Sequence, residues 1–349
     1  MSSRSRPFII PVFLPNRGCP HRCVFCDQSA ITGVRKRISP VYMREHVTRF
    51  LAYKKTSRGR VEIAFYGGNF LGLDNKETMP LLSEARRFVD QDLVNGIRFS
   101  TRPDTITPES LDVIREFPVT TIEIGVQSMD DRVLELSRRG HTASCCAKAI
   151  LLLKQNGYST GAQMMTGLPG DTGAQSIRTA EKLASLEPDF VRIYPTVVIK
   201  NSPLAAMYKL GRYKPQSLEE AVLLAKKLCA IYEDAKIPVI RIGLQPSEEL
   251  NSDSTVVAGP YHPAFGYMVR SEILFDRLKT ALKAHDTEGK SLTVTLPPGQ
   301  GATLRGLKNV NIGRIKKMFG IGSIRIVEDK KVALGQIVCS TSQDSLLSP

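Results

Sequence analysis

Short β-rich runs alternate with helical segments through the first 195 residues, and this alternation limits the possible folds more than any other feature. The expected strands are Phe8–Phe13, Val61–Tyr66, Ile97–Thr101, Thr121–Val126, Ser159–Met165 and Phe190–Tyr194. The helices expected between them are 40–55, 75–92, 108–116, 143–156 and 173–186. Such alternation is typical of a parallel sheet with helices outside it. We therefore predict an α/β fold, a partial (β/α)6 TIM-type barrel whose small-molecule sites lie at the C-terminal ends of the strands.

The pattern changes after residue 195 and indicates a second domain. Residues 195–215 hold three prolines, after which the sequence predicts a helix at 217–235 and a strand at Ile237–Ile242. Another helix is expected at 269–285, and from Ser291 we expect short strands and turns. The predicted domains are a core with the N-terminal cysteine loop over 1–250, a helical extension of that core over 251–288, and a small basic α+β domain over 289–349.

Three cysteines, Cys19, Cys23 and Cys26, follow the first expected strand. Their spacing, C-x3-C-x2-C, supplies three thiolates, one fewer than a cubane of four irons requires. A [4Fe–4S] cluster held in this way leaves one iron open to a small molecule that can chelate it. An open iron beside a strand end indicates chemistry, whereas a closed four-ligand site would indicate a structural role.

Other uses of these cysteines stay open. Zinc could take the three thiolates with His21 as its fourth ligand, although His21 lies within the Cys19–Cys23 loop and its ring would reach the same tetrahedron with difficulty. The three residues could also be inert thiols. A disulfide is disfavoured, because seven cysteines are an odd number and we expect no secretory leader before them. For the remaining cysteines, packing roles are expected: Cys145, Cys146 and Cys229 lie in helical patterns, and Cys339 lies in a strand-like run.

The net charge of +14 is unevenly distributed. Residues 1–60 carry 13 Lys and Arg against 2 Asp and Glu, residues 301–349 carry 8 against 3, and the middle carries 27 against 29. A basic N-terminal segment attracts a polyanion or an acidic substrate, but a solvated basic face that aids solubility explains the charge equally well. No apolar run approaches the roughly 20 residues that span a bilayer, and we expect a cytoplasmic protein with no membrane partner.

Glycines and polar side chains mark the ends of the expected strands. The second strand ends in Tyr66–Asn69, where Gly67 and Gly68 let a ligand approach the backbone closely. The fourth strand ends in Gly125–Ser128, and the fifth runs from Gln163 into Gly167–Gly170. Arg138, Arg139 and His141 lie just after the helix that follows the fourth strand. Each of these motifs alone is weak evidence for a ligand site, since a Gly-Gly pair at a strand end usually forms only a turn.

Taken in order, the cysteines and these motifs resemble the radical S-adenosylmethionine (SAM) proteins. Within that superfamily the chain is most similar to the radical SAM domain of the Elongator catalytic subunit and its bacterial relatives. The runs that carry this likeness are Thr101–Asp104, Arg139–Thr142, Met164–Gly170, Tyr194–Pro195 and Leu210–Pro215. A weaker resemblance, to oxygen-independent coproporphyrinogen oxidase, depends on Gly125–Ser128 and Gly167–Gly170. The resemblance covers about residues 8–285.

The resemblance implies a role for each matching residue. The cluster ligands would be Cys19, Cys23 and Cys26. The methionyl part of SAM would contact Gly67, Gly68 and Asn69, and its ribose or carboxylate would contact Gln127 and Arg139. The adenine would lie near Phe25, and the adenosine would lie against Gly167, Leu168 and Pro169. Gln163 would lie at the rim. For Gln127 and Arg139 the alternative is hydrogen bonding at the rim without a ligand, and for Phe25 it is simple packing.

The chain also departs from these families. Ser100 stands where relatives often place Glu, and Gln163 stands where the porphyrin-related proteins carry Asp. Both departures remove a carboxylate from the SAM pocket. The Elongator subunit continues into an acetyltransferase-like domain for which 349 residues leave no room, so acetyl transfer is not expected.

The resemblance implies an enzyme that reductively cleaves SAM at a [4Fe–4S] cluster and generates a 5′-deoxyadenosyl radical. The Elongator-like runs and the basic N-terminal segment favour RNA, in particular tRNA, as its substrate. The alternatives are a small acidic metabolite such as a porphyrinogen, and a non-enzymatic heme-binding carrier of the same fold. An electron donor such as flavodoxin or ferredoxin is implied, whereas the sequence predicts neither the substrate itself nor the oligomeric state.

Overall fold

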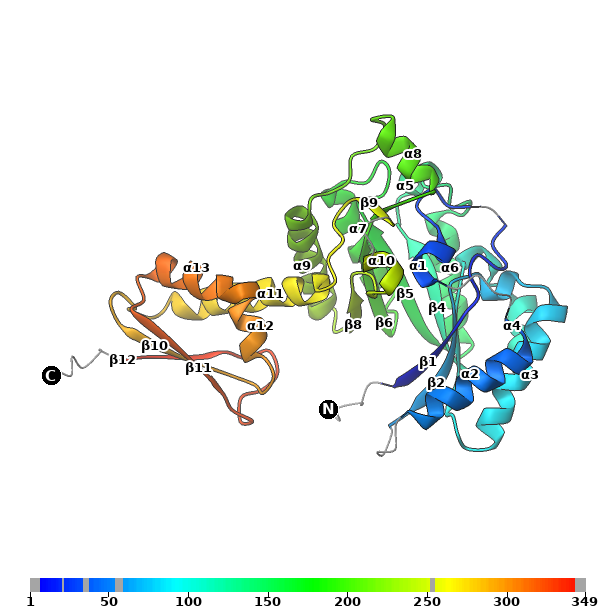
Figure 1. Cartoon of the computed structure of the whole chain (residues 1–349), viewed down its shortest axis with the longest axis horizontal. Coiled ribbons are helices and arrows are strands. Elements are labelled where there is room, and N and C mark those ends of the chain that lie inside the picture. Colours follow the sequence, from blue (N-terminus) through cyan, green and yellow to red (C-terminus); the bar gives the residue numbers. More distant parts are fainter. Residues whose placement is uncertain (1–6, 21, 34–37, 54–58, 252–254, 343–349) are drawn as a thin grey trace. The chain divides into compact units, whose positions relative to one another are not determined.

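The computed structural model describes residues 7–20, 22–33, 38–53, 59–251 and 255–342 (Figure 1). Its contacts group the chain into two compact units. The core unit comprises Met1–Ala221 and Lys227–Pro263, and the C-terminal unit comprises Val222–Lys226 and Ala264–Pro349. Each unit has its own sheet, and each is described by itself below.

The core unit is built on one curled sheet of seven parallel strands in the order β1-β2-β3-β4-β5-β6-β8. The strands are β1 Phe8–Phe13, β2 Val61–Tyr66, β3 Gly96–Thr101, β4 Val119–Gln127, β5 Ser159–Thr166, β6 Phe190–Pro195 and β8 Val239–Ile242. The six predicted barrel strands and the partial TIM-type barrel are confirmed. The seventh strand, which was predicted only as a strand, pairs with β6. Because β1 and β8 are edges, the barrel is open between them.

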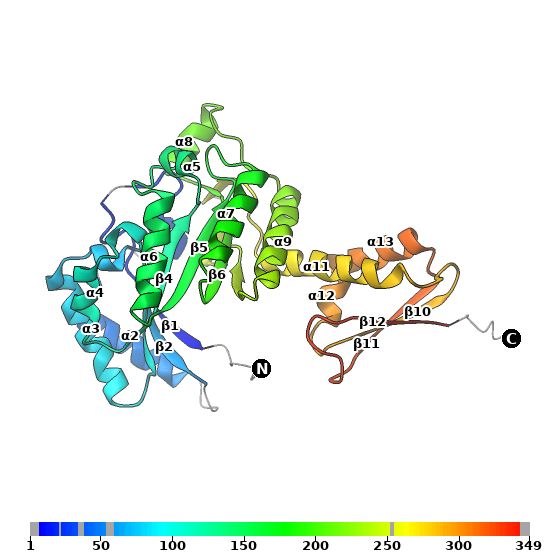
Figure 2. The same ribbon diagram turned by 180° about the vertical axis from the view of Figure 1, so that it is seen from behind.

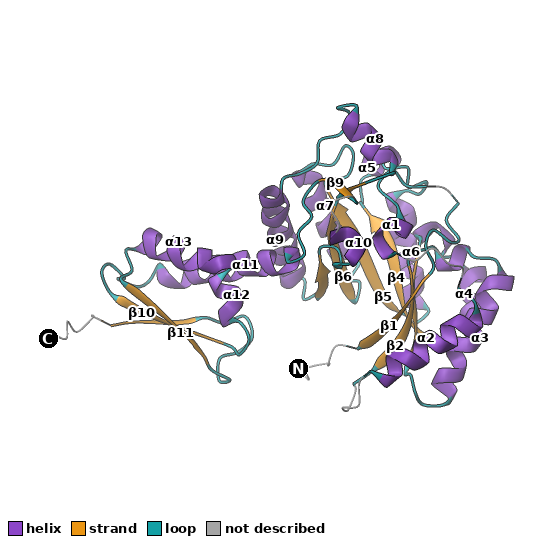
Figure 3. Cartoon of the chain, viewed as in Figure 1, coloured by secondary structure: helices purple, strands orange, loops and turns teal. Residues whose placement is uncertain are grey.

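Helices cover the outer face of this sheet, as Figures 2 and 3 show. They are α2 Pro40–Ala52, α3 Asn75–Asp90, α4 Pro108–Ile114, α6 Ala143–Gln155, α7 Gly173–Ser185 and α9 Leu218–Asp234. The other helices of the unit are α1 Gln28–Thr32, α5 Asp131–Leu136, α8 Pro203–Lys209 and α10 Glu248–Asn251, and the short strands β7 Val198–Ile199 and β9 Val256–Ala258 form a small second sheet. Helix α1 contacts α10, and α8 contacts β7. The predicted starts of α2 and α4 are confirmed: Ser39 accepts a hydrogen bond from the Tyr42 amide, and Thr107 forms a capping box with Ser110.

Aromatic stacking supports the part of the sheet next to the cysteine loop. The 3-10 turn η1 (Phe70–Gly72) follows β2 and inserts Phe70 between Phe65 and Phe99. The ring centroids lie 4.8 and 4.6 Å apart, and all three rings are buried. Burial of three aromatic side chains fixes the chain immediately after Gly67 and Gly68.

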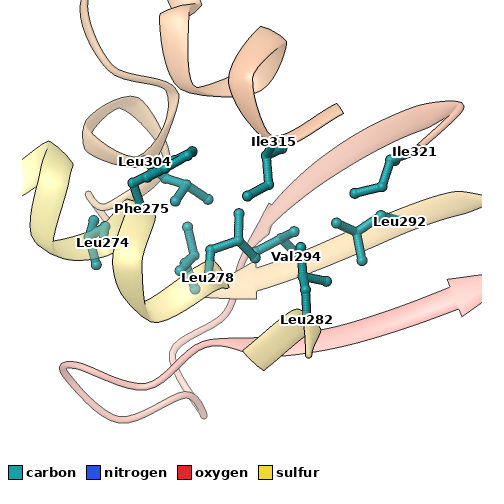
Figure 4. Packing of buried hydrophobic residues seen from close by; sticks show 10 residues of the cluster. Leu274, Phe275, Leu278, Leu282, Leu292, Val294, Leu304, Ile315 and Ile321 are labelled. Carbon is teal, nitrogen blue, oxygen red and sulfur yellow. The ribbon is translucent and has the colours of Figure 1, made fainter. Parts of the chain in front are cut away.

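The C-terminal unit packs three helices against one face of a three-stranded sheet. Its elements are α11 Phe265–Leu282, β10 Ser291–Leu296, α12 Gly301–Arg305, η3 Leu307–Asn309, α13 Val310–Phe319, β11 Ser323–Glu328 and β12 Val338–Ser342. The strand order is β11-β10-β12, with β10 parallel to β11 and antiparallel to β12. Leu278 of α11, Val294 of β10 and Ile315 of α13 meet in its hydrophobic core (Figure 4).

One sequence expectation is revised in this unit. From Ser291 we expected strands and turns, but α13 is a helix of 10 residues. Its start carries no side-chain cap and Gly313 interrupts its pattern, so its local signals are weak, and tertiary burial of Ile315 supports it instead. The contacts also group α11 with the C-terminal sheet, whereas the division at 250 and 288 stays a prediction. Within the described residues, no helix is long and apolar enough to cross a membrane.

Candidate radical site at the strand ends

The loop that carries the cysteines is held against the end of β2 by backbone hydrogen bonds. The Leu14 amide donates to the Tyr66 carbonyl over 2.7 Å, the Asn16 amide to Gly67 over 2.9 Å, and the Asn69 amide to Arg17 over 2.8 Å. A side chain at Gly68 would place its Cβ 2.5 Å from the Leu14 carbonyl oxygen. The contact between the loop and the strand end therefore requires glycine at position 68.

Asn69 uses its whole side chain within the protein. Its Nδ2 donates to the Gly18 carbonyl over 2.7 Å. Its Oδ1 accepts from the Thr101 hydroxyl, the Arg102 amide and the Thr105 hydroxyl, at 2.7, 2.9 and 2.9 Å. The fully buried Asn69 thus ties the cysteine loop to the end of β3, and any contact it makes with a ligand would involve its backbone.

The three cysteines lie close enough to influence one another electrostatically. Burial, together with negative charge at Cys23 and Cys19, raises the pKa of the Cys26 thiol to about 12. Burial and then Cys23 raise the pKa of Cys19. Arg139 opposes both shifts, and its Nη1 donates to the Cys23 sulfur over 3.1 Å. Thiols crowded in this way release their protons when a metal centre supplies positive charge.

The donor set fits an iron–sulfur cluster. Among the described residues, no group of three or more His, Cys, Asp or Glu converges on a single metal ion. In a cubane each thiolate binds a different iron, so three cysteines spread along one loop satisfy it without converging. Soft thiolate ligands also suit such a cluster. His21, the fourth ligand of the zinc alternative, lies outside the described residues.

The ends of β4 and β5 bring several predicted contacts together beside Cys23. Gln127 is buried and has a left-handed φ of 71°, a strained conformation of a kind that clusters at functional sites. Its Oε1 accepts from Nε2 of Gln163 over 3.2 Å. A Cβ at Gly125 would lie 2.9 Å from the Gln127 amide nitrogen and 3.4 Å from the Arg139 guanidinium. Arg139 itself donates to the Gly125 carbonyl as well as to Cys23.

The other predicted contacts form the surroundings of this cluster of side chains. Gly167 has a φ of 71°, its amide donates to Asp171 over 2.8 Å, and its carbonyl accepts from the Tyr213 hydroxyl over 2.6 Å. Leu168 and Pro169 are buried in the same turn. Phe25 is partly buried and packs against the apolar group that includes Leu204. The structure thus places Gly67–Asn69 after β2 and Gly167–Pro169 after β5, and Phe25 packs apart from them. The roles of all these residues toward SAM stay predictions.

A buried charge network lies on the inner face of the barrel and was not predicted from the sequence. Glu123 of β4 accepts from the Tyr66 hydroxyl of β2 over 2.7 Å and lies 2.7 Å from Nε of Arg192 on β6. Arg98 of β3 lies 3.5 Å from Glu123 and 3.3 Å from Glu62. Side chains of β2 and β6 can meet only on the concave side of a curled sheet, because three strands separate them.

This network lies directly below the predicted SAM pocket. Tyr66 immediately precedes Gly67, and Arg192 is the register partner of Gln163. Burial raises the pKa of Tyr66, and the charge of Glu123 raises it further, so its phenol stays protonated. A charged residue amid an apolar strand, as in Ile122-Glu123-Ile124, was the available sequence signal.

Comparison with known proteins agrees with this geometry. The model of the radical SAM superfamily matches residues 13–183, and the model of the radical SAM C-terminal domain matches residues 188–274. The chain belongs to the radical SAM superfamily. It is therefore an enzyme of a group that uses SAM and a [4Fe–4S] cluster, and the resemblance predicted from the motifs is confirmed.

Relatives at modest identity include tRNA-modifying enzymes. The chain is 30% identical over 221 residues to an uncharacterized protein of Methanocaldococcus jannaschii, covering 60% of this chain and 67% of that protein. It is 28% identical over 230 residues to the tRNA uridine(34) acetyltransferase of Dehalococcoides mccartyi, covering 56% of this chain but 50% of that enzyme. The chain therefore spans about half the length of that relative.

A solved structure supports the fold. The archaeal Elp3 of Methanocaldococcus infernus, solved with an N-terminal deletion, matches with a TM-score of 0.60 and 20% sequence identity. The match covers 76% of this chain and 62% of that one. This radical SAM protein thus shares its α/β architecture with Elp3.

Proposed function

We propose that this radical SAM enzyme holds a [4Fe–4S] cluster on Cys19, Cys23 and Cys26, cleaves SAM reductively, and modifies RNA, in particular a tRNA base. The observation that carries the proposal is the cysteine loop itself. It is fixed to the end of β2 and faces the Gln127–Arg139 side of the open barrel, with Arg139 hydrogen bonded to Cys23.

The residues of the chain have separate tasks in this proposal. When bound, the cluster supplies the electron that splits SAM into methionine and the 5′-deoxyadenosyl radical. Arg139 and Gln127 orient the carboxylate or ribose of SAM, and Gly67 leaves its backbone accessible. The buried Tyr66–Glu123–Arg192 group closes the barrel below the pocket and keeps water away from the reacting atoms.

The open edge between β1 and β8 and the relatives support RNA as the substrate. An incomplete barrel admits a macromolecule that a closed one would exclude. The relative from Dehalococcoides mccartyi is a tRNA uridine(34) acetyltransferase, and the N-terminal 60 residues carry a net charge of +11. A flavodoxin- or ferredoxin-type electron donor completes the proposal.

The test is an anaerobic assay of the reconstituted full chain with a chemical reductant and SAM. We expect 5′-deoxyadenosine to form, and its rate to rise when unmodified tRNA transcripts are added. The rise should weaken at higher salt, because phosphate contacts are lost. Stimulation by a porphyrinogen in place of tRNA would contradict the RNA proposal. Failure to form any 5′-deoxyadenosine, together with a heme Soret band, would support the carrier instead.

A further inference from the structure

A stretch without acidic residues lies in the C-terminal unit. Residues 289–327 contain seven Lys and Arg and no Asp or Glu. Glu272 of α11 pairs with Arg314 of this stretch, and both family matches end before the stretch, at residues 183 and 274. The radical SAM fold therefore does not account for this charge.

Five of these seven basic side chains belong to α12, η3 and α13, and all but Arg314 are taken together here. Arg305, Lys308 and Lys317 are exposed and Lys316 is partly exposed. We call these four residues the α12–α13 basic face. In the part of the chain that the structure describes, none of the four lies within ion-pair distance of a carboxylate, and the nearest interaction is that of Arg305, whose charge helps to lower the pKa of Glu328.

Arg314, on the same helix, shows the contrast. Its guanidinium pairs with Glu272 of α11 and lies 3.9 Å from the centre of the Phe275 ring. This arginine is part of the packing between α13 and α11. The four side chains of the α12–α13 basic face form no ion pair of this kind, so their charge is available to an external anion.

The chemistry of the face selects the kind of anion. Unpaired lysines and arginines gain most from a polyanion, because each neutralised phosphate releases a condensed counterion. The large apolar side chains exposed beside them are Leu307, Val310 and Met318, none of which is aromatic. The one aromatic residue of the stretch, Phe319, packs toward the hydrophobic core of the unit. Without an aromatic platform for stacking, contacts to the phosphate backbone of folded RNA are favoured over those to unpaired bases.

We propose that the α12–α13 basic face anchors structured RNA through its phosphates, without reading sequence. This inference rests on the proposed function, which makes RNA the substrate, and adds a binding surface outside the residues assigned to the radical site. The face raises the affinity of the whole chain for tRNA and takes no part in SAM cleavage.

The test compares two charge-matched double variants of the full, cluster-loaded chain. Lys308→Gln with Lys317→Gln removes two charges from the face. Lys148→Gln with Arg178→Gln removes two from α6 and α7, where both side chains are exposed. Affinity for an unmodified tRNA transcript is measured by fluorescence anisotropy at several salt concentrations.

For the face variant we expect a loss of affinity of about ten-fold and a salt slope lower by about 1.5–2, whereas the control variant should bind like the parent. Both variants should keep the parent rate of 5′-deoxyadenosine formation without RNA. A second face variant, Lys316→Gln with Arg305→Gln, should show the same loss, which excludes a folding defect peculiar to one pair.

Parent-like binding by both face variants, or an equal loss in the control variant, would overturn the proposal. So would binding to vesicles that contain phosphatidylserine more tightly than to tRNA, since that result assigns the face to a membrane. These failures differ from failure of the proposed function, in which the parent itself forms no 5′-deoxyadenosine or binds no tRNA.

Discussion

Basic side chains are used in opposite ways in the two units. In the core unit, Arg98, Arg102, Arg139 and Arg192 are largely removed from solvent, and each lies against a carboxylate, a carbonyl or a thiol. In the C-terminal unit, Lys308 and Lys317 are exposed and form no ion pair with a carboxylate among the described residues. A buried and paired charge positions other groups, whereas an exposed and unpaired charge is available to a partner.

Removal of the Glu123 carboxylate should give the largest loss of stability, and it tests the role of the buried arginines of the core unit. Glu123→Gln leaves Arg192 buried without its counter-charge, so we expect a loss of about 3–5 kcal/mol in the free energy of unfolding, measured in urea. The matched control is Asp112→Asn, which breaks an exposed pair with Arg115 and should cost at most about 1 kcal/mol.

Replacement of both members of the buried pair sharpens this prediction. Glu123→Leu combined with Arg192→Met removes both charges, and its stability should return close to that of the parent. Equal losses in Glu123→Gln and in the double variant would show that packing, rather than charge pairing, makes Glu123 important.

Arg139 and its neighbour Arg138 provide a second comparison of a buried arginine with an exposed one. Arg139→Ala removes the donor to Cys23 and to the Gly125 carbonyl, and we expect 5′-deoxyadenosine formation to fall about 100-fold. Arg138 is exposed, and Arg138→Ala should leave the rate unchanged. Equal activity of the two variants would contradict the assignment of Arg139 to the site.

His141 should make the free energy of unfolding depend on pH, because burial and the nearby arginines keep its ring neutral. Burial first, and then the charges of Arg139 and Arg102, lower its pKa to about 3. The unfolded chain takes up a proton on this histidine near pH 6.5 and the folded chain does not, so stability falls as pH drops below 6.5. We expect the parent to lose about 1 kcal/mol more than His141→Gln between pH 7 and 5.5, measured by urea unfolding. Parallel pH curves would show that His141 is protonated in the folded protein.

The smallest change in stability is expected when an exposed basic side chain of the C-terminal unit is replaced. Arg305→Gln should change the free energy of unfolding by less than about 0.5 kcal/mol, because Arg305 is exposed and no described carboxylate lies within ion-pair distance of it. Urea unfolding of the cluster-loaded chain measures this change. A loss above 1 kcal/mol would mean that the α12–α13 basic face is structural.

Local patterns explain which parts of the molecule the sequence could predict. The strands of the barrel were predicted because each is a short apolar run bounded by turn residues, and the cysteine loop was predicted from its spacing. Helix α13 was missed, since Gly313 weakens its pattern and its stability depends on Ile315 reaching a core formed by distant residues.

The contacts within the site could not be predicted from local patterns. Glu123 and Arg192 are separated by 69 residues and meet only because the sheet curls. The sequence indicated Gly68 as a place for a ligand, but its glycine is needed for the approach of the Leu14 carbonyl. Long-range geometry of this kind leaves only a faint local signal, such as a lone charge in an apolar strand.

The most direct test of the central claim is the iron and sulfide content of anaerobically purified chains. The parent and Cys145→Ala, which changes a cysteine of α6 outside the loop, should each hold about four irons and four sulfides per chain. Cys23→Ala should lose most of both, together with the brown colour. Retention of parental iron and colour by Cys23→Ala would contradict the assignment of the three-cysteine loop as the cluster site.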